Sequence, residues 1–283
     1  MAGPSLTGAD RARAVDAEAD AELRDAARGR RVSALQFRDL VLHLARREVD
    51  STHHMTVLGW AWPLTRQLAQ LAVLVFVFSR VLKLGIPNFP VFVFSGLIAW
   101  TWFATGTAKA TGSLIEHRHL LFQPRFPARV VPIVAIVVPL VDVLFALPVL
   151  LLMLGLGQGL AVSVVALPLI VLLQLVLMAG FAWLLAAASV FFRDVPNLVG
   201  VALLLVFYLT PVFYSRHNVP GKFAVILRLN PIGILIEAYR HVLLGTSGPA
   251  WTTLGALGAF SVVTAVIGYV VFTHVESRFV DHV

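Results

Sequence analysis

The chain has 283 residues, of which 59% are hydrophobic and 13% are charged, and it contains no cysteine. Soluble domains carry about 25% charged residues, so this chain lacks the polar surface that a protein needs to face water on all sides. The composition therefore excludes an ordinary soluble protein and indicates one that sits in a lipid bilayer. The missing cysteines exclude a disulfide scaffold, a thiolate zinc site, an iron–sulfur cluster and a cysteine nucleophile.

Charged residues are concentrated at the amino-terminal end of the chain. Residues 1–50 hold 18 of the 37 Asp, Glu, Lys and Arg residues, and residues 1–33 mix both signs among alanines. Such a segment buries too little apolar surface to offset its ordering entropy, so we expect a disordered cytosolic tail or a solvated helix. Its acidic residues also argue against a secretory signal and, despite the net charge of +7, against a nucleic-acid-binding arm.

Residues 34–50 predict an amphipathic helix. Apolar residues such as Leu40 and Leu44 fall on one side at helical spacing, and charged residues such as Arg46 and Arg47 fall mostly on the other. Basic side chains bind anionic lipid headgroups, so this helix is expected to lie along the cytoplasmic membrane interface. Packing on a partner protein is the alternative that the sequence leaves open.

Six later segments are long and apolar enough to cross a membrane, which takes about 20 residues per helix. These expected spans cover residues 62–83, 90–111, 130–154, 160–190, 196–214 and 252–275. Prolines at positions 63, 139, 148 and 168 predict kinks in or at the ends of these helices. Basic residues in the amino-terminal arm and in the second and fourth connections place both termini in the cytosol, although the first and fifth connections also carry basic residues.

The segment between the fifth and sixth expected spans predicts two short helices, at about 221–229 and 232–244. Each is too short to cross the bilayer. Half-length helices occur at membrane depth only when they are buried in protein or line a cavity. We therefore expect a re-entrant helical hairpin over residues 219–247, near the external mouth of a pathway.

Motifs for nucleotide hydrolysis and metal catalysis are absent from the sequence. The chain has three lysines, and none lies in a G-x-x-x-x-G-K-[ST] loop, so a separate subunit must bind any ATP. The histidine pairs at 53–54 and 117–119 lack the further ligands that zinc requires, so no metal site is expected.

Asp142 lies midway along the third expected span, where a charged side chain costs about 3 kcal/mol. It could line a polar conduit or carry protons, or it could fix helix packing through hydrogen bonds, and the sequence leaves these alternatives open. Trp100 and Trp102 lie within the second span, and we expect them to contribute to an interfacial aromatic belt, although aromatic faces also bind sugar rings. Glu237 and Arg240, three residues apart, have the spacing of a local ion pair.

Several motifs occur in an order that resembles the membrane subunits of ABC-2 exporters of O-antigen, teichoic acid and capsule. The motifs are GLIAW at 96–100, LIEHRHLLFQPRFPARVVPI at 114–133, FFRDVPNLV at 191–199, TPVFY at 210–214, LNPIGILIEAYRHVLL at 229–244 and ESRF at 276–279. The resemblance covers about residues 34–283, with the transmembrane domain at 51–283. It departs from the family at 38–54, which reads RDLVLHLARREVDSTHH where family members have R-D-L-K-x-R-Y.

The resemblance implies an all-α integral membrane protein that forms a homodimer on two copies of an ABC ATPase. That ATPase would bind ATP and magnesium, and this chain would bind no cofactor. The implied cargo is a lipid-linked polysaccharide, galactan-like or O-antigen-like, exported across the bacterial cytoplasmic membrane. An ABC-2 exporter of drugs or small lipids, and a membrane-embedded enzyme acting on lipid-linked glycans, are the alternatives.

The resemblance also assigns roles to individual residues. Coupling to the ATPase would fall on residues 113–127, and the side chains expected to carry it are Glu116, His117, Arg118, Arg125, Phe126 and Pro127. A second cytosolic turn would hold Arg193 and Asp194, and an external gate would hold Pro231, Glu237 and Arg240. For the substrate pathway we expect Trp100, Trp102 and Asp142.

Overall fold

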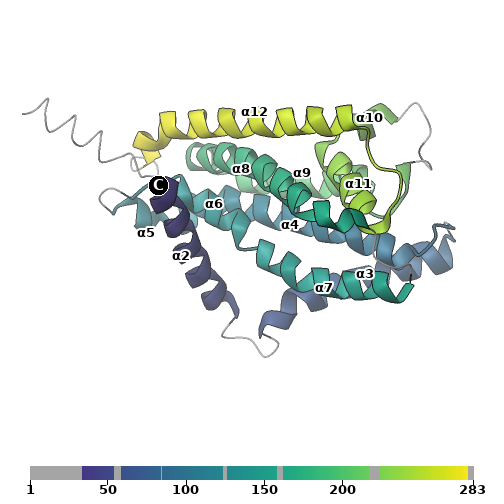
Figure 1. Cartoon of the computed structure of the whole chain (residues 1–283). Helices are drawn as coiled ribbons and strands as arrows, with labels where there is room; N and C mark the ends of the chain where they lie inside the picture. The colour runs from purple at the N-terminus through teal and green to yellow at the C-terminus, as the bar shows by residue number, and fades with distance from the viewer. Residues whose placement is uncertain are drawn as a thin grey trace, which may run out of the picture.

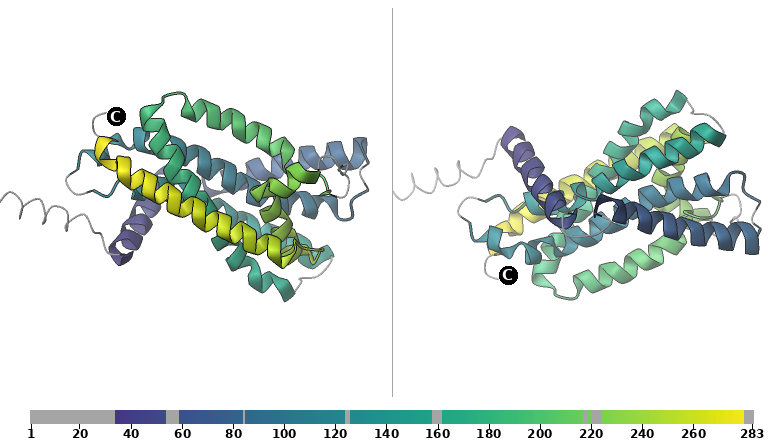
Figure 2. Two further views of the ribbon diagram at one scale, coloured as in Figure 1. Left: turned by 90° about the horizontal axis from the view of Figure 1, so that it is seen from above. Right: turned by 90° about the horizontal axis from the view of Figure 1, so that it is seen from below.

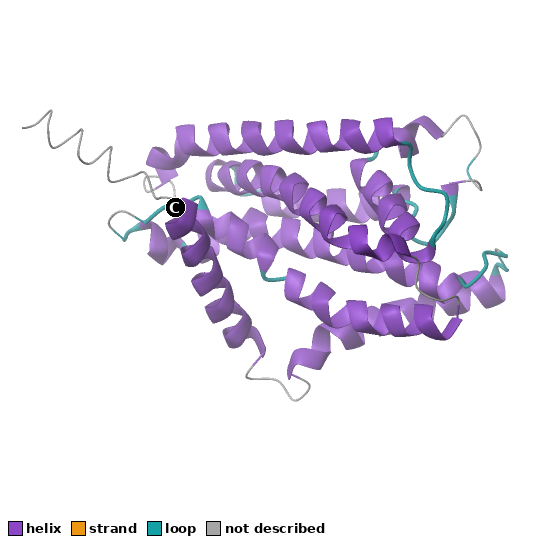
Figure 3. Ribbon diagram, viewed as in Figure 1, coloured by secondary structure: helices purple, strands orange, loops and turns teal. Residues whose placement is uncertain are grey.

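The computed structural model describes residues 34–53, 59–83, 85–123, 126–157, 162–216, 219 and 224–279, so the predicted tail at 1–33 lies outside it. Every regular element in these residues is a helix (Figure 3). The elements are α2 (Ala34–His53), η1 (Gly59–Ala61), α3 (Trp62–Val75), η2 (Phe76–Val81), α4 (Phe89–Glu116), α5 (Arg118–Leu121), α6 (Val130–Val137), α7 (Leu140–Gly157), η3 (Val162–Ala166), α8 (Leu167–Phe191), α9 (Val195–Leu209), α10 (Ala224–Leu229), α11 (Pro231–Leu244), α12 (Trp251–Val275) and η6 (Glu276–Arg278).

Among the described residues, five helical segments are long and apolar enough to cross a membrane. They are Trp62–Val81, Phe89–Glu116, Val130–Gly157, Ser163–Phe191 and Trp251–Arg278. These segments coincide with the first four and the last of the six expected spans. The remaining expected span, at 196–214, corresponds to α9, a shorter apolar helix of 15 residues.

The early end of α9 has a local cause. A proline disfavours the helical region for the residue before it, and Thr210, which precedes Pro211, has extended backbone angles of φ −97° and ψ 136°. A 15-residue helix rises about 22 Å, less than the hydrocarbon thickness of about 30 Å. The helix therefore ends at Leu209 rather than at residue 214, and an irregular segment continues the chain.

The long helices run side by side along one axis and define two ends of a bundle (Figures 1 and 2). We call the end with α5, the turn between α8 and α9 and the close of α12 the arm end, because α2 leaves it at a steep angle. We call the opposite end, with α10 and α11, the hairpin end. Successive long helices alternate in direction between these ends, as a multi-span topology requires.

Helix α4 forms the centre of the bundle. It contacts α3, α6, α7, α8, α9 and α11. Of its most apolar window 72% is buried, against 11% for the window in α3 and η2. Contacts on nearly all sides explain why α4 shows little amphipathic character, since a helix that is apolar all round is a buried one.

The third candidate span is broken into α6 and α7 at Pro139. This proline has no N–H group, and carbonyls at the end of α6 lose their helical donors there. The indole Nε1–H of Trp102 donates to the Ile136 carbonyl at 2.9 Å and so replaces one lost bond. Of the other expected kink sites, Pro148 lies inside α7, whereas Pro63 and Pro168 lie in first turns, where proline is tolerated.

Helices α8 and α12 approach each other very closely at two glycines. A Cβ atom built on Gly268 would lie 2.5 Å from the Gly180 carbonyl oxygen, and one on Gly180 would lie 2.6 Å from the Thr264 carbonyl carbon. Only hydrogen at both positions permits this distance between backbones. Small residues commonly mediate close helix packing in membranes, where lipid provides no hydrophobic drive for association.

Helix α2 packs one stripe of apolar residues against α6. Val41, Ala45 and Val49 are buried against a valine row of α6, whereas Leu35 and Leu42 are exposed. The apolar side of α2 is thus divided between the chain itself and its surroundings. Its placement along the membrane interface stays a prediction.

Candidate coupling and gate sites

The predicted coupling segment begins in the last turn of α4 and continues through the four-residue helix α5. Leu120 of α5 is 9% exposed and belongs to a small core with Val131, Val190 and Phe279, against which Phe126 also packs. These contacts hold α5 against the ends of α6, α8 and α12. A helix too short to be stable alone is therefore fixed by tertiary packing.

The outer face of this segment is charged and aromatic. Glu116 and Arg118 are exposed, and the Phe122 side chain is 59% exposed beside them. Pro127 is half-buried, and Arg125 lies outside the described residues. An exposed aromatic ring among charges on a rigid support is typical of a protein-docking surface.

The second predicted turn, with Arg193 and Asp194, lies next to the same core. Both side chains are exposed, and they follow Phe192, whose side chain is 67% exposed. The core of α5 includes Val190, so the structure brings the two predicted cytosolic sites together. Sequence reasoning missed Phe122 and Phe192, although an aromatic residue beside charges in a short connection is a usable signal.

A polar contact links the coupling segment to α2. The Nδ1 atom of His117 lies 3.0 Å from the Ser113 carbonyl oxygen, and its Nε2 atom lies 3.7 Å from Oε2 of Glu48. Donation to the carbonyl requires a proton on Nδ1, so the contact with Glu48 is an ion pair only when Nε2 is also protonated.

A cavity of about 270 Å³ separates α2, α4 and α6 at the arm end. Arg47 and Lys109 contribute basic groups to its wall, Glu48 and Glu116 contribute acidic ones, and an apolar part is formed by Leu44, Val134 and Val138. The wall therefore has both a polar and an apolar part.

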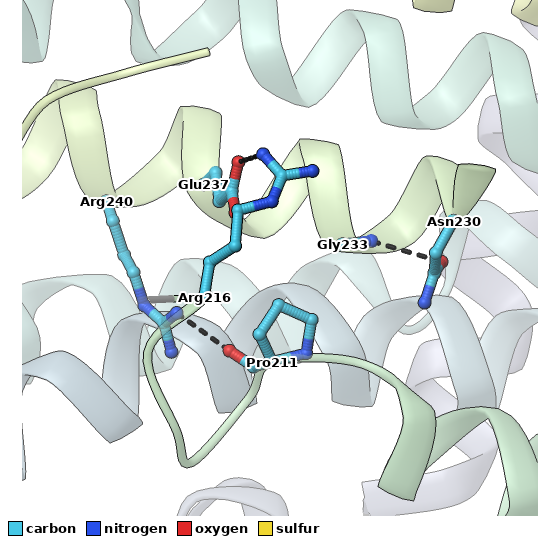
Figure 4. A network of polar contacts seen from close by, with 6 residues as sticks. All are labelled: Pro211, Arg216, Asn230, Gly233, Glu237 and Arg240. Atoms are coloured by element: carbon cyan, nitrogen blue, oxygen red, sulfur yellow. Dashed lines mark hydrogen bonds and ion pairs between the residues drawn. The ribbon is translucent and has the colours of Figure 1, made fainter. Parts of the chain in front are cut away.

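At the hairpin end, the guanidinium of Arg240 bonds to three backbone carbonyls. Its Nη1 donates to Pro211 at 2.7 Å (Figure 4). Its Nη2 donates to Val212 at 2.6 Å, and its Nε donates to Phe92 at 3.3 Å. The side chain is 5% exposed, and its Cζ lies 3.5 Å from the centre of the Phe92 ring. Arg240 thus joins α11 to the start of α4 and to the segment after α9.

Two features make this buried arginine possible. Burial lowers the pKa of the Arg240 guanidinium, and the nearby Glu237 carboxylate opposes this shift and so favours the charged form. Gly96 leaves room on α4, because a Cβ atom there would lie 2.9 Å from Nη2 of Arg240 and 3.1 Å from the Val212 carbonyl oxygen. This explains the glycine of the GLIAW motif.

Glu237 forms an ion pair with Arg216 and not with Arg240, the partner that its sequence spacing favoured. Its Oε2 accepts a 2.8 Å hydrogen bond from Nη1 of Arg216, in the irregular segment after α9 (Figure 4). Arg240 points to the other side of that segment, toward backbone carbonyls. The local ion pair allowed by the Glu237–Arg240 spacing is therefore replaced by two separate connections to residues 211–216, which spacing within one helix cannot reveal.

The start of α11 is tied to the end of α9. Oδ1 of Asn230 accepts from the backbone N–H groups of Ile232 and Gly233, at 3.0 and 3.1 Å, and so caps the helix. Its Nδ2 donates to Oγ1 of Thr210 at 2.8 Å. Pro231 occupies the first helical position, where its missing N–H costs nothing.

The three predicted pathway residues do not form one cluster. Trp102 is 1% exposed and bonds to the break in the third span, whereas Trp100 is 6% exposed and packs on Phe207 of α9 at a ring distance of 5.4 Å. Asp142 is half-buried in the first turn of α7. Contact of these residues with cargo stays a prediction. In the described part of the chain, no three His, Asp or Glu side chains group closely enough to hold a metal ion.

Comparison with known proteins identifies the family. Residues 39–244 match the family described as ABC-2 type transporter. The chain is 35% identical over 232 residues to an O-antigen export system permease protein RfbA of Myxococcus xanthus, covering 81% of this chain and 89% of that protein. It is 26% identical over 247 residues to an RfbA of Klebsiella pneumoniae, covering 86% and 94% of the two chains. A polysialic acid transport protein KpsM of Escherichia coli is 21% identical over 230 residues, or 80% and 89% of the two chains. The chain therefore belongs to the ABC-2 type transporter family.

Proposed function

We propose that this chain is the permease subunit of an ATP-driven exporter that moves a lipid-linked polysaccharide, of the O-antigen or galactan type, across the bacterial cytoplasmic membrane. The similarity to permeases named for O-antigen export carries the proposal. The chain itself acts as a conduit and binds no cofactor. ATP and magnesium bind to a separate ATPase subunit.

The proposed topology has six spans, with α9 as the fifth, and both termini in the cytosol. The alternating direction of the long helices supports it, because the arm end then faces the cytosol throughout (Figure 1). Helix α2 lies on lipid headgroups, and α10 and α11 form the re-entrant external gate. The shortness of α9 fits this arrangement, because the chain turns back into the hairpin before it has crossed the full hydrocarbon layer.

The proposed ATPase contact is the outer face of α5 together with the α8–α9 turn. Each is exposed, and they share one core, so force applied to α5 reaches α6, α8 and α12 directly. Two ATPase copies serve two permease copies. A docked helix held by a packed core transmits a rigid-body displacement better than a mobile loop does.

The proposed homodimer covers the open faces of α3 and α9. On α9 a single residue, Val199, is buried, whereas Leu204, Leu205 and Tyr208 are exposed. The polysaccharide passes between the two copies. Trp100 lies directly behind α9 through its contact with Phe207, and Trp102 and Asp142 belong to the same proposed pathway.

The proposed entrance for the polar end of the lipid carrier is the arm-end cavity between α2, α4 and α6. Its wall holds Arg47 and Lys109 together with Glu48 and Glu116, so it suits a polar headgroup, and its apolar part suits the adjoining hydrocarbon. This placement puts the lipid headgroup next to His117 at the start of the coupling segment.

Transport of radiolabelled lipid-linked glycan into inverted membrane vesicles tests the proposal. Uptake is expected to require ATP and both subunits. The double replacement Glu116→Ala with Arg118→Ala is expected to reduce uptake and stimulated ATP hydrolysis, whereas Arg80→Ala, an exposed arginine near the hairpin end, leaves both unchanged. Uptake by the permease without any ATPase would overturn the proposal, and normal coupling in the double variant would remove α5 from it.

A further inference from the structure

A second cavity, of about 660 Å³, lies at the hairpin end. It is enclosed by α11, by the segment after α9 and by the link from α11 to α12. Its wall carries a carboxylate, two guanidinium groups and several hydroxyls, from Ser215, Arg216, Glu237, Arg240, Ser247 and Thr253. The volume is within the range of about 300–1,000 Å³ that is usual for small-molecule sites.

Two guanidinium groups and one carboxylate face this cavity, and one guanidinium is paired with the carboxylate. Arg216 and Glu237 form an ion pair at 2.8 Å, and their side chains are 31% and 18% exposed, so the pair is accessible from the cavity. Three N–H groups of Arg240 are bonded to backbone carbonyls and its side chain is 5% exposed, so few of its donors are available to a ligand. An anionic ligand would gain Arg216 but would also meet the Glu237 carboxylate, which disfavours a phosphate.

Paired donors and acceptors suit a neutral ligand with neighbouring hydroxyl groups. A carboxylate accepts up to about four hydrogen bonds and a guanidinium donates up to about five, so both groups can bind a diol while they remain paired with each other. Adjacent hydroxyls of a sugar ring supply a donor to Glu237 and an acceptor to Arg216. Side-chain hydroxyls such as that of Thr253 can do either.

The cavity is also held in a fixed shape. Arg240 fastens one wall to backbone at residues 211 and 212, and Asn230 fixes the start of α11 to the end of α9. A site whose groups are already oriented loses less conformational entropy when a ligand binds. Pre-orientation matters most for sugars, because hydroxyl groups gain little from being moved out of water unless each is bonded.

We propose that this cavity binds one to a few neutral hexose residues of the exported glycan as it passes the hairpin end. The inference rests on the proposed polysaccharide cargo and names the site and the part of the cargo that occupies it. The ligand is the uncharged saccharide rather than the lipid phosphate.

Binding of tritiated galactotetraose to the full chain in lipid nanodiscs tests the inference. Saturable binding is expected, and Glu237→Gln is expected to weaken it about tenfold because a charged acceptor is lost. Thr253→Val is expected to weaken it severalfold. The control is Thr252→Val, a neighbour on α12 that does not line this cavity. It lines an adjacent cavity that Thr253 also borders, so unchanged binding by this variant assigns the effect of Thr253→Val to the proposed sugar site. If Glu237→Gln does not fold, the pair of threonine variants decides the outcome.

Three results would overturn the inference: no saturable binding, equal binding by Thr253→Val and Thr252→Val, or displacement of the sugar by inorganic pyrophosphate, which indicates an anion site. The vesicle assay separates this failure from failure of the transport function. Vesicles that export glycan while the permease binds no galactotetraose would refute the sugar site alone. Vesicles with both subunits that export nothing would refute the transport function instead.

Discussion

The two ends of the bundle differ in whether the polar side chains of the predicted sites are buried and bonded or exposed. At the hairpin end, Arg240, Glu237 and Asn230 bond to groups of the same chain and are mostly buried. At the arm end, Glu116 ends α4 and Arg118 begins the short helix α5, and both side chains are exposed. Leu120 and its neighbours hold α5 in place. The same helices connect both ends, so the difference lies in the connections and not in the spans.

This contrast indicates which end is complete within one chain. A buried network in which every charged group has a partner rigidifies its surroundings, and losing one member leaves the others unsatisfied. Exposed charges contribute little to folding and are available to another protein. Substitutions at the hairpin end should therefore change stability, whereas substitutions at the arm end should change association.

The largest expected effect comes from Arg240→Met. The change leaves three buried carbonyls without their donor, and we expect it to lower the free energy of unfolding by about 3 kcal/mol. Reversible unfolding in detergent micelles, followed by circular dichroism, measures it.

A matched control for this prediction is Arg216→Gln at the same end. It removes one half-buried ion pair and should cost about 1 kcal/mol or less. Equal losses for the two arginines would contradict the distinction between Arg240, which is buried and bonded to backbone carbonyls, and the half-buried Arg216.

The second largest effect is expected in the middle of the bundle, which must be rigid if the two ends are to act together. Gly268→Ala places a Cβ atom 2.5 Å from the Gly180 carbonyl oxygen, so α12 must shift away from α8, at a cost of about 2 kcal/mol. Gly258→Ala, on the same helix with no atom within 4 Å of its Cβ, should be neutral or stabilising. Similar losses for both, in the same unfolding measurement, would mean that the crossing is not tightly packed.

The spans were predictable from sequence because a helix that crosses a bilayer must be apolar over about 20 residues, whatever it packs against. Five of the six expected spans coincide with long apolar helices. Pro211 is a sequence signal for the end of the remaining one at Leu209, since a proline disfavours helix at the preceding residue. The apolar segment itself continues to Tyr214, so hydropathy alone predicts a longer helix.

The gate contacts were less predictable than the spans. Arg240 bonds to carbonyls of residues 92, 211 and 212, and nothing in the sequence near Arg240 specifies these partners. Backbone acceptors have no sequence signature, because every residue carries one. One sequence signal for this contact is Gly96 on α4, whose missing side chain leaves the space that the guanidinium fills.

At the arm end, Arg118→Glu is expected to leave the unfolding free energy within about 0.5 kcal/mol of the original, because the side chain is exposed. It should weaken binding of the ATPase subunit about tenfold, with a strong dependence on salt. Surface plasmon resonance with the reconstituted permease measures this, and Arg80→Glu near the hairpin end serves as the control. A large loss of stability with unchanged ATPase binding would reverse the roles assigned to the two ends.

The smallest expected effect concerns the tie between α2 and the coupling segment. Nε2 of His117 and Oε2 of Glu48 lie 3.7 Å apart and both side chains are about one-third exposed, so we expect a coupling energy of about 0.3 kcal/mol. A double-mutant cycle of His117→Gln and Glu48→Gln isolates this pair from the other contacts of each residue. Coupling this weak would let α5 and α2 move separately, as the proposed roles of α5 in ATPase docking and of α2 on the membrane interface require. Coupling above about 1 kcal/mol would show that the arm end is locked like the hairpin end, and the contrast between them would then fail.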